Sequence, residues 1–453
     1  MAGRRRPGGS VWAAVHTAAV GSLWPLPAAA VVLAVGLGAF LPRVDEALQG
    51  GGRESLDLVF GGGPGAARTV LSAIATSIIS ATTLLFSLTI VTLQLASSQY
   101  SPRLLQTFVR DRVVQLCLGE LLGTFVYALV VLRTVRSSDE SGAGAFVPRL
   151  SVTVALVLTL GAVAALVTFL SHQTTQLRVE TMMRDVHAEA TGALGNLAED
   201  HGAAAEREVP VLPPHARPVC CRRSGFLVEV REEELLRVLV GAGAVLRLDR
   251  RPGDPLVAGA PAGWAWTDPP ADPLRLDDVE AALADALVVH HERADAAGPS
   301  YGLRKLVDIA VRALSPGVND PTTAVHALSH ISALVGDACT RDIGPRVLRD
   351  ADGVPRLAVP SWGFPALLDL AVTQIRHYGH REAAVAAGLF TLLAEVGWRC
   401  RTPCQRRAVA HQRELMVQQW SDDPPAGRTT EDVRRWAVTV DGALAGRWDA
   451  VGD

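Results

Sequence analysis

The sequence predicts an α-helical integral membrane protein in which four transmembrane helices precede a mostly helical α+β cytoplasmic domain. Charge is distributed unevenly: residues 1–172 carry 20 charges (12 Arg and 8 Asp or Glu, net +4), whereas residues 173–453 carry the other 69 (31 basic and 38 acidic, net −7). The first part also contains four apolar runs, each long enough to cross about 30 Å of hydrocarbon. Because charged side chains are costly in lipid, we assign residues 1–172 to a membrane domain.

The first predicted span covers residues 23–41. Pro25 and Pro27 lie near its start, where proline is tolerated because the N–H groups of the first turn have no partner within the helix. An arginine triplet at residues 4–6 precedes the apolar run, as in a signal peptide, but no A-x-A cleavage site follows the run. We therefore expect an uncleaved first span.

The other three spans are predicted at residues 69–96, 113–132 and 150–171. An even number of spans puts both termini on the same side of the membrane. The arginine triplet at residues 4–6 places them in the cytoplasm, because positive charge stays on the cytoplasmic side. We therefore expect a multi-pass protein of the bacterial inner (cytoplasmic) membrane.

Three further segments follow the spans. Residues 173–222 are predicted as a helical extension of the fourth span and a Pro-rich linker, residues 223–268 as a small β region, and residues 269–453 as a mostly helical cytoplasmic domain. The β region contains GFLVEV, AVLRLDR and a WAW run around the turn RPGD. Helical patterns occur at about 275–292, 301–314, 321–337, 363–378, 381–396, 403–419 and 430–446, with a hairpin signal at RVLRDADGVPRLAV.

Composition and motifs exclude several functions. The acidic C-terminal part offers no basic face for a nucleic acid, and the chain has no G-x-x-x-x-G-K-S/T loop, Rossmann fingerprint or G-x-S-x-G elbow. No nucleophile and base are recognisable together, so we predict neither an enzyme nor a cofactor. The six cysteines have no framework spacing, which is typical of a reducing compartment: Cys117, Cys220, Cys221, Cys339, Cys400 and Cys404.

The second span carries its polar side chains on one face. At about 100° per residue, they fall within an arc of roughly 80°, interrupted near Ile90 and Val91. Hydroxyl and amide groups favour another helix or water over acyl chains. One interpretation is a pore lined by copies of this helix in a homo-oligomer, with Ile90 as an apolar constriction; the other is close helix packing through small residues. The polar residues are Thr69, Ser72, Thr76, Ser80, Thr83, Ser87, Gln94 and Ser98.

The third span contains one carboxylate, Glu120. An ionisable residue at membrane depth is a candidate proton or cation site, but Glu120 lies close enough to the span end to reach its polar surroundings. Gly119 and Gly123 flank it in a G-x-x-x-G arrangement, which favours close helix packing or oligomerisation.

The clearest motif of the cytoplasmic domain is ALSPGVNDPTTAVHALSH. Ser315, Pro316, Gly317 and Asn319 are predicted to form a tight turn, with Asp320 as the N-cap and Pro321 as the first residue of the next helix. A structural corner is the favoured interpretation. His326 and His330 have the i, i+4 spacing of metal ligands, but no H-E-x-x-H pattern accompanies them, and we predict no metal site.

Two long blocks carry a resemblance to a known family. The stretch from LSAIATSIISATTLLFSLTIVTLQLASSQYSPRLL to LGTFVYALVVLRTVR, and YGLRKLVDIAVRALSPGVNDPTTA between Tyr301 and Ala324, resemble a bacterial family of predicted membrane proteins, domain of unknown function 2254. The resemblance implies four spans and a cytoplasmic domain, but no activity or catalytic residue. Glu120 stands where the family usually has an uncharged residue, so it cannot underlie a shared function.

Two hypotheses for function follow. The first is an oligomeric channel or passive transport protein with the second span lining the pore. The second is a membrane-anchored sensor or scaffold that acts through its cytoplasmic domain, since some 60% of the chain follows the spans. In both, the lipid bilayer is a partner, and we expect a homo-oligomer.

Overall fold

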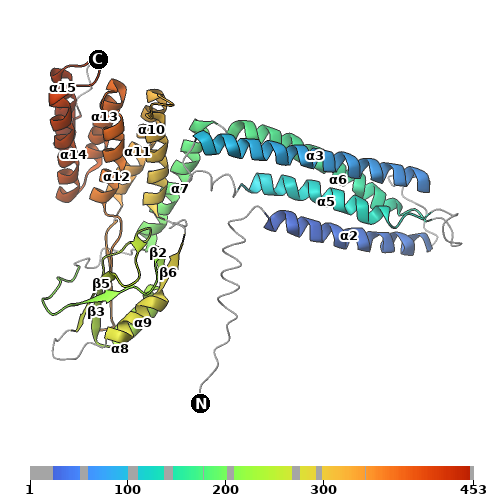
Figure 1. The fold of residues 1–453 in the computed structure, drawn as a ribbon, viewed down its shortest axis with the longest axis horizontal. Coiled ribbons are helices and arrows are strands. Elements are labelled where there is room, and N and C mark those ends of the chain that lie inside the picture. The colour runs from blue at the N-terminus through green and yellow to red at the C-terminus, as the bar shows by residue number, and fades with distance from the viewer. Residues whose placement is uncertain are drawn as a thin grey trace. The chain divides into compact units, whose positions relative to one another are not determined.

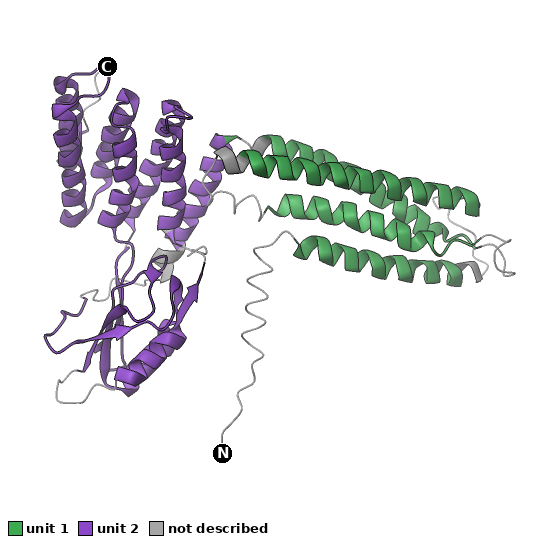
Figure 2. Ribbon diagram, in the orientation of Figure 1, with its two compact units in different colours: residues 1–178 green, residues 179–453 purple. Residues whose placement is uncertain are grey.

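A computed structural model of the chain describes residues 24–50, 60–99, 111–136, 146–176, 178–200, 209–267, 276–291, 298–341 and 343–448. The chain divides into two compact units, residues 1–178 and residues 179–453, which we call the N-terminal and the C-terminal unit (Figure 2). The arginine triplet at residues 4–6, on which the predicted orientation rests, lies outside the described residues.

The N-terminal unit consists, in its described residues, of four long helices (Figure 1). All four are long and apolar enough to cross a membrane, which confirms the predicted number of spans. The first begins at Pro25, as the two prolines predicted. The helices are α2 (Pro25–Gly50), α3 (Pro64–Gln99), α5 (Arg112–Leu132) and α6 (Arg149–Gln176).

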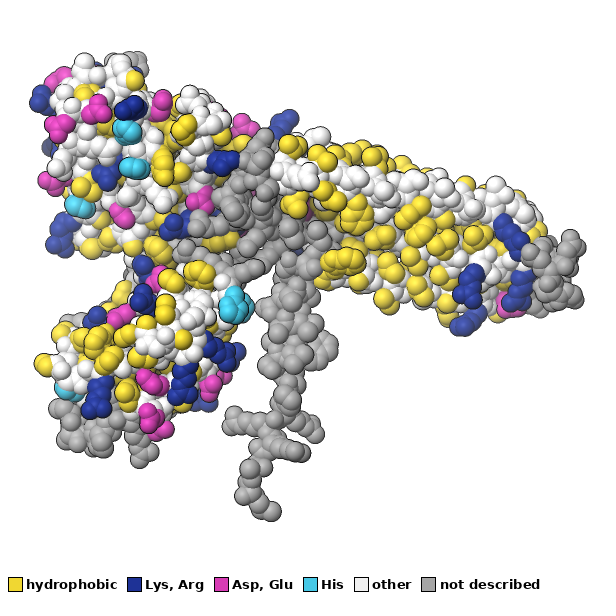
Figure 3. Space-filling model, in the orientation of Figure 1, with side chains coloured by type: hydrophobic (Ala, Val, Ile, Leu, Met, Phe, Trp, Pro, Cys, Tyr) yellow, Lys and Arg dark blue, Asp and Glu magenta, His cyan; other side chains and the backbone are white. Residues whose placement is uncertain are grey.

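Helix α5 is the centre of this unit. It packs against α2, α3 and α6. In its most apolar stretch of 18 residues, 56% of the residues are buried, compared with 22–28% in the corresponding stretches of the other three helices. The outer faces carry exposed apolar side chains, for example Val32 on α2 and Leu160 on α6. Figure 3 shows such side chains over much of the visible face of the unit. An apolar exterior of this kind is the surface that hydrocarbon solvates best.

The C-terminal unit contains helices and two small sheets. Its helices are α7 (Val179–Asp200), α8 (Glu232–Gly241), α9 (Leu276–Ala286), α10 (Pro299–Ala313), α11 (Pro321–Thr340), α12 (Phe364–Tyr378), α13 (Ala383–Arg399), α14 (Pro403–Asp422) and α15 (Thr430–Leu444). Its strands are β1 (Arg217–Cys220), β2 (Gly225–Val230), β3 (Ala244–Leu248), β4 (Pro255–Leu256), β5 (Pro261–Thr267), β6 (Leu287–His290), β7 (Arg346–Arg349) and β8 (Pro355–Val359).

The five-stranded sheet has the order β1-β5-β3-β8-β7, and the three-stranded sheet the order β4-β2-β6. Strands β7 and β8 form the predicted hairpin, which lies between α11 and α12 in the sequence. Strand β8 pairs in parallel with β3, with Leu246 opposite Leu357. The two sheets share an apolar core with α8 and α9. Strands therefore occur on both sides of the residues 223–268 that the sequence assigns to the β region.

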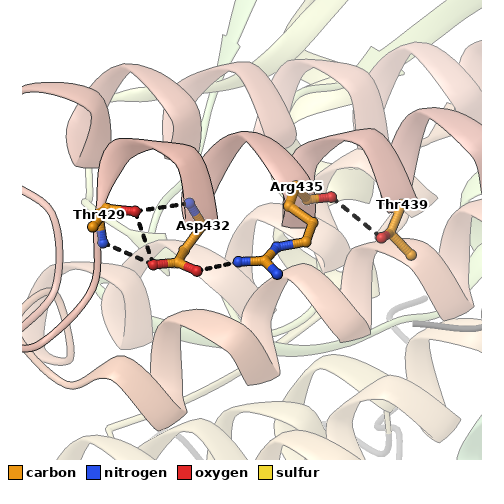
Figure 4. Close-up of polar contacts among 4 residues, drawn as sticks. All are labelled: Thr429, Asp432, Arg435 and Thr439. Atoms are coloured by element: carbon orange, nitrogen blue, oxygen red, sulfur yellow. Dashed lines mark hydrogen bonds and ion pairs between the residues drawn. The ribbon is translucent and has the colours of Figure 1, made fainter. Parts of the chain in front are cut away.

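Helices α7 and α10–α15 make up the helical part of this unit. Within it, α11 packs against α10, α7 and α13, and α13 packs against α15. The starts of α11, α14 and α15 carry side-chain caps. Figure 4 shows the start of α15, where the Thr429 hydroxyl accepts from the Asp432 N–H and the Asp432 carboxylate accepts from the Thr429 N–H. These reciprocal bonds form a capping box. The bonds that the Asp432 carboxylate accepts from the Thr429 N–H and hydroxyl hold the pKa of Asp432 below its usual range.

Two details differ from the sequence prediction. Residues 232–241 form helix α8, which was not predicted because EEELLRVLVG is short and lies between two strand patterns; its three first-turn glutamates favour a helix start. The helix predicted at 275–292 ends at Ala286, and residues 287–290 form β6 beside β2. Cross-strand pairing decides between helix and strand for this short apolar run.

Candidate functional site

Helix α3 has two opposite faces. Its packed face is mainly apolar: Leu71 and Leu85 are almost completely buried against the rest of the unit. Two threonines, Thr82 and Thr92, are buried on the same side. Ser80 follows Leu71 by nine residues, and Leu85 follows Thr76 by nine, which places the members of each pair about 180° apart on the helix. The predicted polar side chains therefore point away from α5 and α6. We call the exposed set the α3 stripe: Thr69, Ser72, Thr76, Ser80, Thr83, Ser87, Ile90 and Gln94.

Several hydroxyls of the α3 stripe are bonded within the helix itself. Thr69 donates to the Gly65 carbonyl at 3.0 Å, Ser80 to the Thr76 carbonyl at 2.8 Å and Thr83 to the Ile79 carbonyl at 2.9 Å. This local bonding lowers the cost of hydroxyls in an apolar environment. It leaves the hydroxyl oxygens available as acceptors toward whatever covers the stripe.

Apolar side chains border the α3 stripe on both sides. Leu84 and Val91 lie on one flank and Phe86 on the other, by the rotation of about 100° per residue, and all three are exposed. Ile90 lies within the stripe and is 55% exposed, so it interrupts the polar surface one turn before Gln94. Ser98 belongs to the same helix, but its side chain is outside the described set.

All eight members of the stripe are exposed, so among the described residues no helix of the same chain covers the stripe. Helix packing within the chain uses a different small-residue pair. Gly119 and Gly123 of α5 face α2: a Cβ at Gly119 would lie 3.3 Å from the Ala30 Cβ and 3.6 Å from the Pro27 Cα. The G-x-x-x-G arrangement therefore serves the α2–α5 contact.

Glu120 lies on the side of α5 that faces α6. A Cβ at Gly161 of α6 would be 2.8 Å from the Glu120 Oε1, so Gly161 leaves the room that the carboxylate occupies. The Thr124 hydroxyl, one turn further along α5, donates to the Leu158 carbonyl of α6 at 3.5 Å. Because the α3 stripe points away from α5, Glu120 and the stripe belong to separate surfaces.

The buried polar contacts at the helix ends were not predicted from the sequence. Asp45 near the end of α2 accepts from the Leu150 and Ser151 N–H groups, each at 2.9 Å, and from the Ser151 hydroxyl at 2.7 Å. Asp111 caps α5 through the Val113 N–H. Acidic residues next to apolar runs were the available signal for both caps, but the partners of Asp45 are more than 100 residues away.

A second polar contact at a helix end joins the N-cap of α5 to α6. The Asp111 carboxylate lies 2.5 Å from the His172 Nε2. Tyr127, fully buried in the middle of the unit, donates to the Ser151 carbonyl at 3.0 Å. These contacts fix α5 and α6 relative to each other, so the face that α3 presents outward has a rigid support.

The corner between α10 and α11 has the predicted geometry. The Ser315 carbonyl accepts from the N–H groups of Val318 and Asn319, and Asn319 has φ +49°, the one positive φ of a non-glycine residue in the described chain. Asp320 caps α11: its carboxylate accepts from the Thr323 hydroxyl and, at 3.1 Å, from the Thr323 N–H. Those bonds lower the pKa of Asp320.

The rest of the corner motif also lies where predicted. Pro321 is the first residue of α11, and Pro316 and Gly317 form the exposed tip of the turn. With its own carboxylate at the helix start, the corner is built as a structural turn.

The two histidines of α11 have different surroundings. His330 lies beside His187 of α7, with ring centroids 5.3 Å apart, whereas His326 is exposed. Among the described residues, no group of three or more His, Cys, Asp or Glu side chains is arranged to hold a metal ion. Burial lowers the pKa of His330, and the charges of His187 and His326 lower it further.

Comparison with known proteins places this chain in a family without an established activity. The family model described as "Predicted membrane protein (DUF2254)" matches residues 20–395. Uncharacterised proteins of Mycobacterium bovis and of two Mycobacterium tuberculosis strains are 34% identical over 428 residues, which is 92% of this chain and 81% of each relative. No solved structure matches the chain.

Proposed function

Since this chain belongs to the DUF2254 family of predicted membrane proteins, we propose that it is an oligomeric channel or passive transport protein in which copies of α3 line a pore. One observation carries the proposal: the polar face of α3 lies opposite its packed face, so it is directed away from its own chain. The orientation supports a pore, and close packing against a helix of a neighbouring copy is the other interpretation of the stripe.

The physical argument concerns what covers the α3 stripe. Acyl chains offer no hydrogen-bonding groups, so a lipid-facing stripe would leave the Gln94 amide and the hydroxyl acceptors unmatched. A ring of α3 helices would turn the stripe toward a central water column. The apolar flanks, which include Leu84 and Phe86, would then contact neighbouring copies or lipid. Side-chain hydroxyls and amides are suitable lining groups for hydrated ions and small polar solutes.

Ile90 would be the narrow, water-poor part of such a pore. Its apolar side chain projects from the same face as the hydroxyls and is 55% exposed. A ring of isoleucines excludes water from a narrow passage and so acts as a hydrophobic gate. Replacing Ile90 with serine should wet this ring and raise the unitary current.

The test is recording from full-length protein reconstituted in planar bilayers. Val91→Ser is the matched control, because Val91 is the next residue, is 49% exposed and lies about 100° away from Ile90 around the helix. We expect Ile90→Ser to increase the unitary current severalfold and Val91→Ser to leave it unchanged. Silent bilayers across voltage, membrane tension and ion type would contradict the proposal.

The orientation is part of the same proposal: both termini in the cytoplasm of a bacterial inner membrane. Reporter fusions at the C-terminus of the full chain test it, with a fluorescent protein active in the cytoplasm and alkaline phosphatase active outside it. We expect fluorescence without phosphatase activity. The reverse pattern would invert the pore but leave the α3 argument unchanged.

A membrane-anchored sensor or scaffold is the second candidate function. It is favoured by the C-terminal unit, which has its own apolar core around the sheets and a separate helical part. This candidate predicts that full-length protein in detergent captures a defined ligand or protein. A thermal shift with one ligand class, together with silent bilayers, would favour it over the channel.

A further inference from the structure

Two loops of the β region meet beside each other. Residues 221–224 join β1 to β2, and residues 257–260 join β4 to β5. The Cys221 N–H donates to the Ala260 carbonyl at 3.1 Å, and the Gly259 N–H donates to the Cys221 carbonyl at 2.9 Å. Because these bonds run in both directions between the loops, the two loops form one surface, which we call the loop tip.

Side chains hold the loop tip in one shape. The Cys221 thiol, which is 5% exposed, donates to the Val257 carbonyl at 2.8 Å. The Ser224 hydroxyl accepts from the Ala258 N–H at 2.9 Å. The loop tip is therefore ordered before it meets a partner, which lowers the entropy cost of binding.

The loop tip exposes two arginines next to an apolar side chain. Arg222 and Arg223 are both exposed, and Val257 on the neighbouring loop is 61% exposed. At the base of the tip, the carboxylate of Glu280 on α9 accepts from the Cys220 N–H at 3.1 Å. Neither arginine forms an ion pair with any residue that the structure describes. The surface therefore combines positive charge with an exposed apolar group.

This combination fits the surface of an anionic lipid bilayer. Each arginine close to acidic headgroups favours the bound state by about fivefold. An exposed valine gains by entering the boundary between the headgroups and the acyl chains. Residues 173–453 carry a net charge of −7, so an anionic surface repels the C-terminal unit except where arginines gather. Charge therefore selects the orientation in which the loop tip faces the lipid.

The chain is also anchored next to the lipid. Helix α6, the fourth candidate span, ends at Gln176, and α7 begins three residues later at Val179. Binding of the loop tip to the same bilayer is therefore intramolecular, and a weak attraction is sufficient at the high effective concentration that an anchor provides.

We propose that the loop tip docks on the anionic phospholipid headgroups of the bilayer that holds the chain. Arg222 and Arg223 bind lipid phosphates, for which the guanidinium offers paired N–H donors, and Val257 enters the headgroup region. Docking holds the β region at the membrane surface. The proposal is independent of the pore, because it involves only the C-terminal unit and lipid.

The experiment is hydrogen–deuterium exchange of full-length protein in lipid nanodiscs, read by mass spectrometry. One set of nanodiscs contains phosphatidylcholine alone, and the other an equal mixture with phosphatidylglycerol. We expect exchange in residues 221–224 and 257–260 to be severalfold slower in the anionic nanodiscs. The difference should vanish at about 1 M salt, where charges are screened beyond about 3 Å. The turn at residues 350–354 is the internal control, because it carries Asp350 and Asp352 and should exchange equally in both lipids.

A charge-removing variant tests the arginines. Arg222→Gln combined with Arg223→Gln should weaken docking about 30-fold and abolish the difference between the two lipids. The matched control is Arg217→Gln combined with Arg237→Gln. Both control arginines are exposed, at the start of β1 and on α8, so the control also removes two positive charges but leaves the loop tip intact. It should keep the lipid-dependent protection.

Val257→Asp tests the apolar contribution, because a carboxylate would be repelled by acidic headgroups. It should also remove the difference between the lipids. If a variant fails to fold, the lipid and salt dependence of the unaltered protein decides the proposal. Equal exchange of the two loops in both lipids would overturn it. Equal and strong protection in both lipids would overturn it as well, and would assign the loop tip to a protein partner such as a second copy.

Discussion

Helices α5 and α3 each carry a seam of small residues, and the fold uses the two seams in different ways. On α5, Gly119 and Gly123 let the α2 backbone approach until Ala30 and Pro27 fill the space. On α3, the serines and threonines of the stripe face outward. In sequence, both patterns indicate close helix contact. The comparison teaches that a small-residue seam becomes informative about function when the chain's own helices leave it uncovered.

Breaking the α5 seam should have the largest effect. In Gly119→Leu, the new side chain would meet Ala30 and Pro27, because even a Cβ lies within 3.6 Å of both. We expect a loss of about 3 kcal/mol or more of stability, the upper range for overpacking. The measurement is thermal unfolding in detergent. Gly36→Leu is the control, since nothing lies within 4 Å of a Cβ at Gly36; equal melting of both variants would contradict the role of the seam.

Removing the contact between Asp45 of α2 and the start of α6 tests how much the buried polar contacts at the helix ends stabilise the N-terminal unit. Asp45→Ala deprives the start of α6 of three hydrogen bonds. We expect a loss of about 2 kcal/mol, the cost of a lost cap with buried donors, measured by thermal unfolding in detergent. Glu46→Ala, at the neighbouring residue, should be nearly neutral. A similar loss in both variants would show that Asp45 has no special role.

The contact between α7 and α11 differs from the two small-residue seams, because it contains titratable groups, His187 and His330. The folded state lowers the pKa of His330 by burial beside His187, so the unfolded chain binds more protons near pH 6. Stability should therefore fall as pH drops from about 7 through 6, by less than about 1 kcal/mol because the ring is partly exposed. His330→Gln should flatten the dependence measured by urea unfolding at pH 7.5 and 5.5.

The control for this titration is His411→Gln, because His411 is exposed on α14. It should keep the slope of the unaltered protein. Carboxylates whose pKa values are lowered, such as Asp320 and Asp432, act in the same direction but in a lower pH range. A slope that persists in His330→Gln would assign the effect to other groups.

Changing the α3 stripe should have the smallest effect on folding of the single chain. Thr76→Val and Thr83→Val remove hydroxyls that point away from the packed face, so we expect changes within about 0.5 kcal/mol. In bilayers, the same double variant should reduce the unitary current, because the lining loses polar groups. The matched control is Thr82→Val together with Thr92→Val, on the buried face. A stability loss well above about 0.5 kcal/mol, or an unchanged unitary current, would contradict the comparison between α3 and α5.

Much of the fold could be predicted from the sequence. The four spans, the prolines at the start of α2, the hairpin of β7 and β8 and the corner ending at Pro321 lie where local patterns indicated. Membership of the family was also confirmed. These features depend on hydropathy, turn chemistry and capping, which act over a few residues. Helix α8 and strand β6 were missed because their short apolar runs fit both helix and strand until neighbouring strands decide.

The candidate site also has features that the sequence predicts and features that depend on the tertiary structure. Periodicity alone established that the polar residues of α3 share one face, because the helix repeat fixes their angles. Only the tertiary structure decided that this face is opposite the packed one, that Gly119 serves α2, and that Glu120 lies beside Gly161. The same holds for Asp45 with Ser151. Contacts between distant residues depend on which helices pack together. That packing is decided by the shapes of all helix faces together, because side chains in a protein interior interdigitate closely.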